Sequence, residues 1–324
     1  MATQYITTEG SVFHMEEDLY KPGNILFVDQ YSIKTTDGMT TSVVVGSGSE
    51  PGYVEGVGEA ARFKTIFGFK QVSKSQVFVA DSGNQCLRSV DRETNQTSLF
   101  VGIPGEKGCV DGPAAEAQFD FPYALMLASK SSLLVSDCFN NAIRLVNLNT
   151  REVSKFITDI PTPKHMVMHP SGTEFYLCMK NSVVKADVPS RTYNILTSTE
   201  PGYQDGHIAT SKFEWPSGLD WLAHDTLVVA DTSLDKEYNS NTKRIRVISL
   251  EEEEVTSMCP SVSLTTDECS FYNVQSVLKS GDQLYIGGDG SINVKNMRIG
   301  FCERVQNFCS RVYTKAYGLW VPES

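Results

Sequence analysis

The chain of 324 residues lacks the segments that mark several protein classes. No apolar run approaches the roughly 18 residues that cross a bilayer, so no membrane-spanning segment is expected. Its N-terminus, MATQYITTEG, has neither the basic nor the apolar region of a signal peptide. Lys and Arg number 28 against 39 Asp and Glu. The resulting net charge of −11 disfavours a phosphate-binding face, so nucleic acid is not an expected partner.

Motifs of several enzyme classes are also missing. The sequence contains no GxSxG, no P-loop, no dinucleotide fingerprint and no HExxH. Its eight cysteines form no CxxC, which leaves zinc ribbons and thioredoxin-like sites without support. Four of them form two close pairs, Cys259/Cys269 and Cys302/Cys309, and such pairs fit disulfides that close short loops. The alternative is that these cysteines are small apolar core residues.

Two features bear on location. The late cysteine pairs and the glycosylation sequon Asn95-Gln96-Thr97 favour an extracellular protein or one of the secretory lumen, here as a trimmed ectodomain. The missing signal peptide leaves a cytoplasmic location as the alternative. The chain is also expected to be a fragment of a larger protein as readily as a whole one.

What the chain does contain is a repeat. The stretches PGYVEGVGEAARF (51–63), PGEKGCVDGPAAEAQF (104–119) and PGYQDGHIATSKF (201–213) each place a Phe seven residues after an acidic-Gly pair. An Asp closes an apolar run 25 residues after that Gly, and an Arg follows each Asp. The repeated positions, in chain order, are Gly56, Phe63, Asp81 and Arg88, then Gly112, Phe119, Asp137 and Arg144, then Gly206, Phe213, Asp231 and Arg246.

The repeat spacing predicts the fold. The period is 56 residues from the first copy to the second and 94, twice 47, from the second to the third, with a degenerate unit between them. Half-units at 25–46 and 274–299 bring the number of units to six. Periods of this length are typical of propellers and solenoids. Short β-branched runs separated by Gly, Asp and Asn turns predict four antiparallel strands in each unit. The expected fold is therefore an all-β, six-bladed β-propeller.

The pattern PG…(D/E)G…A.F..P.G…VAD..N..IR resembles the NHL repeat. In the second copy it is carried by Gly105, Asp111, Gly112, Phe119, Pro122, Asp137, Asn140 and Arg144. The resemblance covers about residues 10 to 300, is specific in three blades and weak in the other three. It implies a six-bladed propeller of the NHL type. Such propellers mostly act as platforms that bind ligands or proteins, some bind RNA, and a few relatives are lyases or hydrolases.

A single propeller domain is expected over residues 1–300. Its blades are predicted at about 10–46, 51–102, 104–158, 159–198, 200–258 and 261–300. The tail, 301–324, is expected to pack on the propeller or to close it. Two ways of closing the ring stay open, because either residues 1–20 or the tail can complete a blade.

The repeated residues have structural interpretations. Gly permits the turn in the connection between blades, and the acidic residue beside it bonds N–H groups there. The Phe is expected to be a wedge buried between blades, which stabilises by roughly 1.5–3 kcal/mol. The Asp residues recur in identical context, which favours turn formation over metal binding. The repeated Arg residues are expected to pair with neighbouring loops.

Three residues are weak candidates for a metal site in the central channel. His165 and His169 lie four apart on a predicted inner strand, which would place both on one face, and Asp220 lies on another inner strand. The resemblance brings two enzyme comparisons, a zinc-dependent lyase with channel histidines from several blades and a calcium-dependent lactonase. The other inner strands considered, FGFKQV, YALMLA, SGLDWL and VQSVLK, contain no further histidine, which counts against the lyase.

The sequence therefore favours a non-catalytic platform that binds a protein or peptide through one propeller face, with no catalytic residue and no cofactor expected. Candidate partner-binding aromatics lie at the blade entries, namely Tyr53, Phe67, Tyr123, Tyr203 and Trp215. Packing between blades explains these aromatics equally well. A polar insertion at 232–243 lengthens one loop toward a partner. The alternative is a metal-dependent enzyme of the lyase or lactonase type, with zinc or calcium in the channel.

Overall fold

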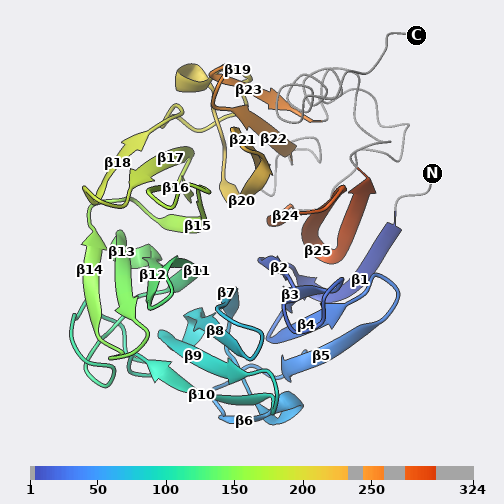
Figure 1. The fold of residues 1–324 in the computed structure, drawn as a ribbon, viewed down its shortest axis with the longest axis vertical. Helices are drawn as coiled ribbons and strands as arrows, with labels where there is room; N and C mark the ends of the chain where they lie inside the picture. Colours follow the sequence, from blue (N-terminus) through green and yellow to red (C-terminus); the bar gives the residue numbers. More distant parts are fainter. Residues whose placement is uncertain (1–3, 233–243, 259–273, 297–324) are drawn as a thin grey trace.

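The computed structural model describes residues 4–232, 244–258 and 274–296. Within these ranges the chain forms six antiparallel sheets arranged around one axis, with short 3-10 turns as its only helical segments (Figure 1). This is the predicted six-bladed propeller. No helix in the described part is long and apolar enough to cross a membrane.

In blades one to five the four main strands follow one another from the axis outward, and the short β6 and β19 lie at the outer edge (Figure 1). Blade one comprises β2 (Met15–Glu17), β3 (Ile25–Asp29), β4 (Ser32–Thr36) and β5 (Thr41–Gly46). Blade two comprises β6 (Gly56–Val57), η1 (Gly58–Ala60), β7 (Ile66–Gln71), β8 (Gln76–Asp81), η2 (Ser82–Asn84), β9 (Cys86–Asp91) and β10 (Gln96–Val101). Blade three comprises β11 (Pro122–Ser129), β12 (Ser132–Asp137), η3 (Cys138–Asn140), β13 (Ala142–Asn147) and β14 (Val153–Ile157).

The second half continues the pattern. Blade four comprises β15 (Pro163–Met168), β16 (Glu174–Met179), β17 (Ser182–Asp187) and β18 (Thr192–Ile195). Blade five comprises β19 (Gly206–His207), η4 (Ile208–Thr210), β20 (Pro216–Ala223), β21 (Thr226–Asp231), β22 (Arg244–Ser249) and β23 (Glu254–Ser257). Blade six comprises β24 (Ser276–Ser280), β25 (Gln283–Asn296) and β1 (Gln4–Ser11). Two blades thus have a fifth short strand, because the Gly after the acidic residue pairs with the outer strand.

The N-terminal strand joins the last blade to the first. β1 pairs antiparallel with β25, with Ile6 opposite Ile292 and Thr7 opposite Ser291. Ile6 is buried in a cluster with Val12 and Phe27, so the strand carries core contacts as well as backbone hydrogen bonds. Of the two ways of closing the ring, the structure has the one through the N-terminal residues. The tail, 301–324, lies outside the described residues.

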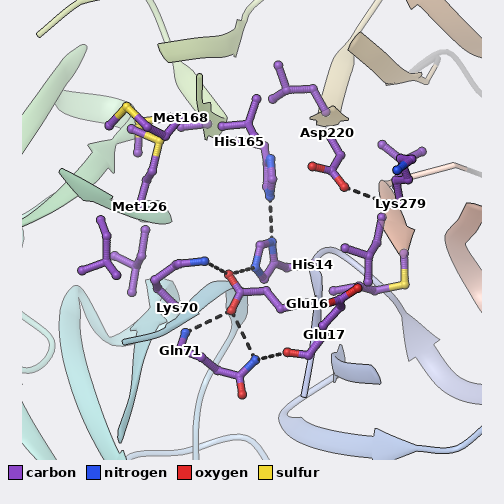
Figure 2. A pocket seen from close by; sticks show the side chains of 18 of the residues that line it. His14, Glu16, Glu17, Lys70, Gln71, Met126, His165, Met168, Asp220 and Lys279 are labelled. Carbon is purple, nitrogen blue, oxygen red and sulfur yellow. Dashed lines mark hydrogen bonds and ion pairs between the residues drawn. The ribbon is translucent and has the colours of Figure 1, made fainter. Parts of the chain in front are cut away.

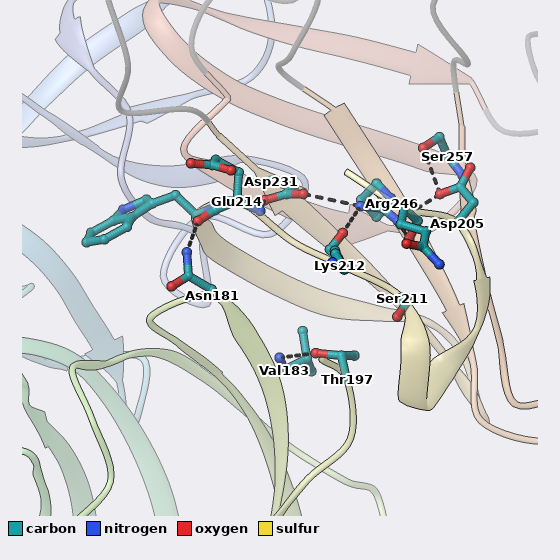
Figure 3. Close-up of polar contacts among 12 residues, drawn as sticks. Asn181, Val183, Thr197, Asp205, Ser211, Lys212, Glu214, Asp231, Arg246 and Ser257 are labelled. Atoms are coloured by element: carbon teal, nitrogen blue, oxygen red, sulfur yellow. Dashed lines mark hydrogen bonds and ion pairs between the residues drawn. The ribbon is translucent and has the colours of Figure 1, made fainter. Parts of the chain in front are cut away.

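In blades two, three and five the repeated arginine holds the connection that enters the blade, and Figure 3 shows it for Arg246. Arg246 donates from Nη2 to the carbonyl of Gln204 at 2.9 Å and to Asp205 Oδ1 at 2.7 Å. From Nη1 it donates to the carbonyl of Lys212 at 2.9 Å and to Asp231 Oδ2 at 3.3 Å. Equivalent carbonyls accept from the repeated arginine in two other blades. Arg144 donates to the carbonyls of Val110 (2.8 Å) and Gln118 (3.0 Å). Arg88 donates to the carbonyls of Val54 (2.9 Å) and Arg62 (2.7 Å).

The acidic residue of each acidic-Gly pair bonds an outer strand rather than its own turn. Asp205 Oδ2 accepts from the N–H of Ser257 at 3.0 Å (Figure 3). Glu55 accepts from Leu99 N–H at 2.8 Å, across 44 residues of chain. The pair therefore ties the entry of a blade to its own outermost strand, which was not apparent from turn chemistry alone.

The repeated Phe residues fill the gaps between blades. Phe63, Phe119 and Phe213 have no solvent exposure. Phe63 packs against residues of blades one and two, Phe119 against blades two and three, and Phe213 against blades four and five. Each lies beneath its blade's repeated arginine, whose guanidinium carbon is 4.5 to 5.2 Å from the ring centroid.

The described cysteines are free thiols. Cys86, Cys138 and Cys178 are buried and Cys109 is exposed. The two late pairs on which the disulfide prediction rests, and residues 233–243 of the predicted insertion at 232–243, lie outside the described residues.

Candidate functional site

A cavity of about 520 Å³ lies on the propeller axis (Figure 2). Its wall comes from the innermost strand of all six blades, because alternate residues of each inner strand face the axis. The charged residues of the wall are Glu16 and Glu17 from blade one, Lys70 from blade two, Asp220 from blade five and Lys279 from blade six. Methionines and aliphatic residues fill the remainder, so the cavity has both polar and apolar walls.

Two histidines meet across the axis. His14 Nδ1 and His165 Nε2 lie 2.7 Å apart and share a hydrogen bond, although 151 residues separate them (Figure 2). They come from blades one and four, which are opposite each other in a ring of six. Burial, followed by the proximity of His14, lowers the pKa of His165 to about 3. His165 is therefore neutral at physiological pH, and one ring donates to the other.

A carboxylate and an ammonium group pair beside the histidines (Figure 2). Glu16 Oε1 lies 2.5 Å from Lys70 Nζ and 3.6 Å from His14 Nε2, and Glu16 Oε2 accepts from the N–H of Gln71 at 3.0 Å. Burial alone would raise the pKa of Glu16, but the charge of Lys70 and the bonds to its carboxylate outweigh burial and lower it to about 2. Glu16 is thus a fixed anion of the cavity wall.

Asp220 behaves in the opposite way. It accepts from the N–H groups of Lys279 and Trp221, each at 2.8 Å, and has no cation at salt-bridge distance among the described residues. Burial raises its pKa from 3.8 to about 6, although both N–H groups act to lower it. A carboxyl group that titrates near neutral pH in a cavity is typical of a functional residue.

This raised pKa predicts a stability that depends on pH. Between about pH 4 and 6 the folded state holds a proton on Asp220 that the unfolded state has lost, so stability falls as pH rises. From pH 4 to 7.5, the unfolding free energy of the natural protein should fall relative to that of Asp220→Asn by about 2–3 kcal/mol. Urea titrations at the two pH values measure the change, and a difference that stays constant with pH would contradict it.

The structure separates His165 from His169, which the sequence placed on one face of a strand. His165 and Asp220 both line the cavity, but β15 ends at Met168, so His169 lies in the following turn and contacts Ser171, Trp221 and His224. The sequence reasoning missed His14. A signal for it exists, since VFHMEE (12–17) parallels IFGFKQ (66–71), an inner strand of the repeat.

A row of aromatic rings lies at the end of the channel where the inner strands begin. Phe13, Phe67, Phe121 and Phe139 follow one another with centroid distances of 4.4, 5.1 and 4.7 Å, across blades one, two and three. We call these four residues the aromatic strip. Tyr123 stacks on Phe67 from the buried side at 4.6 Å. Phe139, at 54% exposure, is the most accessible ring.

The other candidate aromatics are dispersed. Each of these rings has a cation over its face. The guanidinium carbon of Arg88 lies 4.6 Å from the ring centroid of Tyr53, and that of Arg244 lies 5.1 Å from the centroid of Tyr203. Lys164 Nζ lies 3.5 Å from the ring centroid of Trp215. Of the five aromatics that the sequence singled out, the structure therefore brings only Phe67 and Tyr123 together.

Comparisons with known proteins agree with the fold. No protein-family model matches the chain. Protein SUPPRESSOR OF QUENCHING 1, chloroplastic, of Arabidopsis thaliana is 28% identical over 200 residues, which cover 56% of this chain and 19% of that protein. NHL repeat-containing protein 2 of Bos taurus is 30% identical over 107 residues, which cover 32% of this chain and 15% of that protein. The chain thus spans less than a fifth of the length of either relative.

A solved structure extends the comparison to nearly the whole chain. An auxiliary nutrient binding protein from Bacteroides thetaiotaomicron superposes with a TM-score of 0.65 at 11% identity, covering 89% of this chain and 69% of that one. By its sheets and axial cavity, the protein is a six-bladed β-propeller. Its repeated residues and its partial likeness to an NHL repeat-containing protein support a propeller of the NHL type.

Proposed function

We propose that this propeller is a binding platform that receives a peptide segment of a protein partner on the aromatic strip. The observation that carries the proposal is the continuous contact of four aromatic rings across three blades, with Phe139 open to solvent. Clustered aromatic side chains supply large apolar contact area and dominate many protein interfaces. A partner with an exposed aromatic or aliphatic side chain matches this surface.

The backbone at the centre of the strip supports the same proposal. Phe121 has φ of 63°, in the left-handed region that bulky residues rarely adopt. The N–H of Phe121 donates to Gln85 Oε1 at 2.6 Å, and this hydrogen bond holds the backbone of Phe121 in this conformation. Strained conformations of this kind concentrate at functional sites. Here the strain positions an aromatic ring between Phe67 and Phe139.

The test selects peptides that bind the immobilised natural protein and measures their affinity for Phe139→Ala. We expect binding at least about tenfold weaker, equivalent to about 1.4 kcal/mol, because truncation removes the exposed anchor. Met39→Ala is the matched control, since Met39 is 93% exposed and lies in the turn between β4 and β5. Equal affinity for Phe139→Ala and the natural protein would refute the proposal.

A second candidate is an enzyme with its site in the axial cavity. Asp220 lines that cavity with a pKa near 6, and a carboxyl group that titrates this close to neutral pH is suited to acid–base chemistry. The cavity residues do not fit a resident zinc or calcium ion as they are arranged. His14 and His165 bond each other, and Glu16 is held by Lys70. The titration of Asp220 described above tests the premise of this candidate.

A further inference from the structure

A second pair of histidines lies outside the cavity, on two neighbouring hairpin turns. His169 follows β15 in blade four, and His224 and Asp225 form the turn between β20 and β21 in blade five. One potential ligand atom from each of the three side chains lies within 4.8 Å of the other two. His224 and Asp225 are exposed and His169 is partly buried, so solvent ions reach the group.

The nitrogen atoms of His169 and His224 are arranged as in metal sites. His169 Nδ1 lies 2.8 Å from Ser171 Oγ and 3.2 Å from the backbone N of Ser171. In the tautomer that carries its proton on Nδ1, this nitrogen donates to Ser171 Oγ and Nε2 is the metal-binding atom, which is the usual arrangement of a metal-binding imidazole. His224 Nδ1 lies 3.0 Å from Asp225 Oδ2, so imidazole and carboxylate already converge. The two histidine rings contact each other at 5.3 Å.

The backbone that carries these side chains is held across the blade boundary. Trp221 Nε1 donates to the carbonyl of Met168 at 2.8 Å, directly before His169. The Trp221 ring contacts the edge of His169 at 5.1 Å and Tyr176 at 5.3 Å. This indole therefore sets the separation of the two turns. Binding of a metal ion requires only that the ends of the three side chains move closer together. Bonds of 2.0–2.2 Å to one tetrahedral ion leave ligand atoms about 3.3 Å apart, within reach of small side-chain rotations.

We propose that His169, His224 and Asp225 bind one divalent transition-metal ion on this face of the propeller. Two imidazoles and a carboxylate suit zinc, nickel or copper and disfavour calcium, which takes six to eight oxygen ligands. Three protein ligands leave an open position on a tetrahedral ion, available to water or to a donor group from a partner. The proposal does not depend on the aromatic strip, which involves other blades.

The experiment titrates the metal-free full chain with Zn²⁺ by calorimetry under reducing conditions, and records the Co²⁺ spectrum. We expect about one ion per chain at this site, and at least tenfold weaker binding by both His169→Ala and His224→Ala. His207→Ala is the matched control, because His207 is also exposed, pairs with a carboxylate, Glu253, and lies elsewhere in blade five. The Co²⁺ complex should lack the intense thiolate charge-transfer band that coordination by cysteine produces.

Two results would overturn the assignment. One is the absence of stoichiometric binding by the natural protein, and the other is binding that both His→Ala substitutions leave unchanged. In the second case His165→Ala would show whether the ion is in the axial cavity instead. Both substituted histidines lie in turns, and thermal unfolding of each variant verifies that a loss of binding is not a loss of fold.

Discussion

Replacing Arg144 by Met is expected to destabilise the propeller by about 3–5 kcal/mol. The side chain of Arg144 has no solvent exposure, and its guanidinium donates to Asp137 Oδ2 at 2.8 Å and Asp111 Oδ1 at 2.6 Å. It also satisfies two backbone carbonyls of the connection into blade three. Burial already raises the pKa of Asp137, and without the guanidinium its fully buried carboxyl group loses its counter-ion, so it must either stay charged without a partner or take up a proton, and both are costly.

Urea unfolding measures this effect, with Lys130→Met as the control. Lys130 is exposed in the turn between β11 and β12, so removal of its charge should change stability by less than about 0.5 kcal/mol. A loss below about 1 kcal/mol for Arg144→Met would show that the buried ion pair does not hold the blade entry. Asp137→Asn should lower the free energy of unfolding less when it is introduced into the Arg144→Met variant than when it is introduced into the natural protein. In the Arg144→Met variant it removes a buried carboxyl group that has no counter-ion.

Deleting residues 1–11 is expected to have the other large effect, by opening the ring. The deletion removes β1, leaves the edge of β25 unpaired, and takes away the N–H groups of Glu9 and Gly10 that bind Asp29 at 2.7–3.0 Å. Truncating the buried Ile6 alone to Ala should cost about 2–5 kcal/mol. The whole deletion should exceed that and replace one cooperative unfolding transition by broader, separate ones.

The comparison that decides this prediction uses the same strand. Thr7 is exposed, so Thr7→Ala should leave the unfolding midpoint within experimental error, whereas Ile6→Ala and the deletion should lower it in increasing order. Circular dichroism and limited proteolysis during urea unfolding follow the transitions. A deleted chain as stable and as cooperative as the natural one would mean that β1 does not close the propeller.

Much of the fold was predictable because the residues of the repeat recur at fixed spacings along the sequence. The spacing from acidic-Gly pair to Phe to Asp recurs in three blades and the spacing from Asp to Arg in two of them, and each residue acts within its blade or at the adjacent boundary. Arg144 and Arg246 accordingly hold equivalent carbonyls in their two blades. The fifth strands and the outer-strand partner of the acidic residue needed the structure, because the outer strand that they join lies more than 40 residues away in the sequence.

The candidate sites were less predictable. His165 and Asp220 were singled out on inner strands and do line the cavity. The sequence did not indicate that His165 would meet His14, or that His169 would leave the strand and face His224. Of the aromatic strip the sequence singled out only Phe67, together with Tyr123 that stacks on it, since the rings that meet are decided by how neighbouring blades pack.

The sequence by itself determined the number of blades, the residues that separate and join them, and the NHL type of the propeller. The separating and joining residues make contacts within a blade or with its neighbour, so each full copy of the repeat carries them, and counting the copies and partial copies gives the number of blades. Only the tertiary structure decided which side chains share a site. The closure of the ring brings opposite blades together on one axis, and the meeting of His14 with His165 across 151 residues results from that closure rather than from any local pattern.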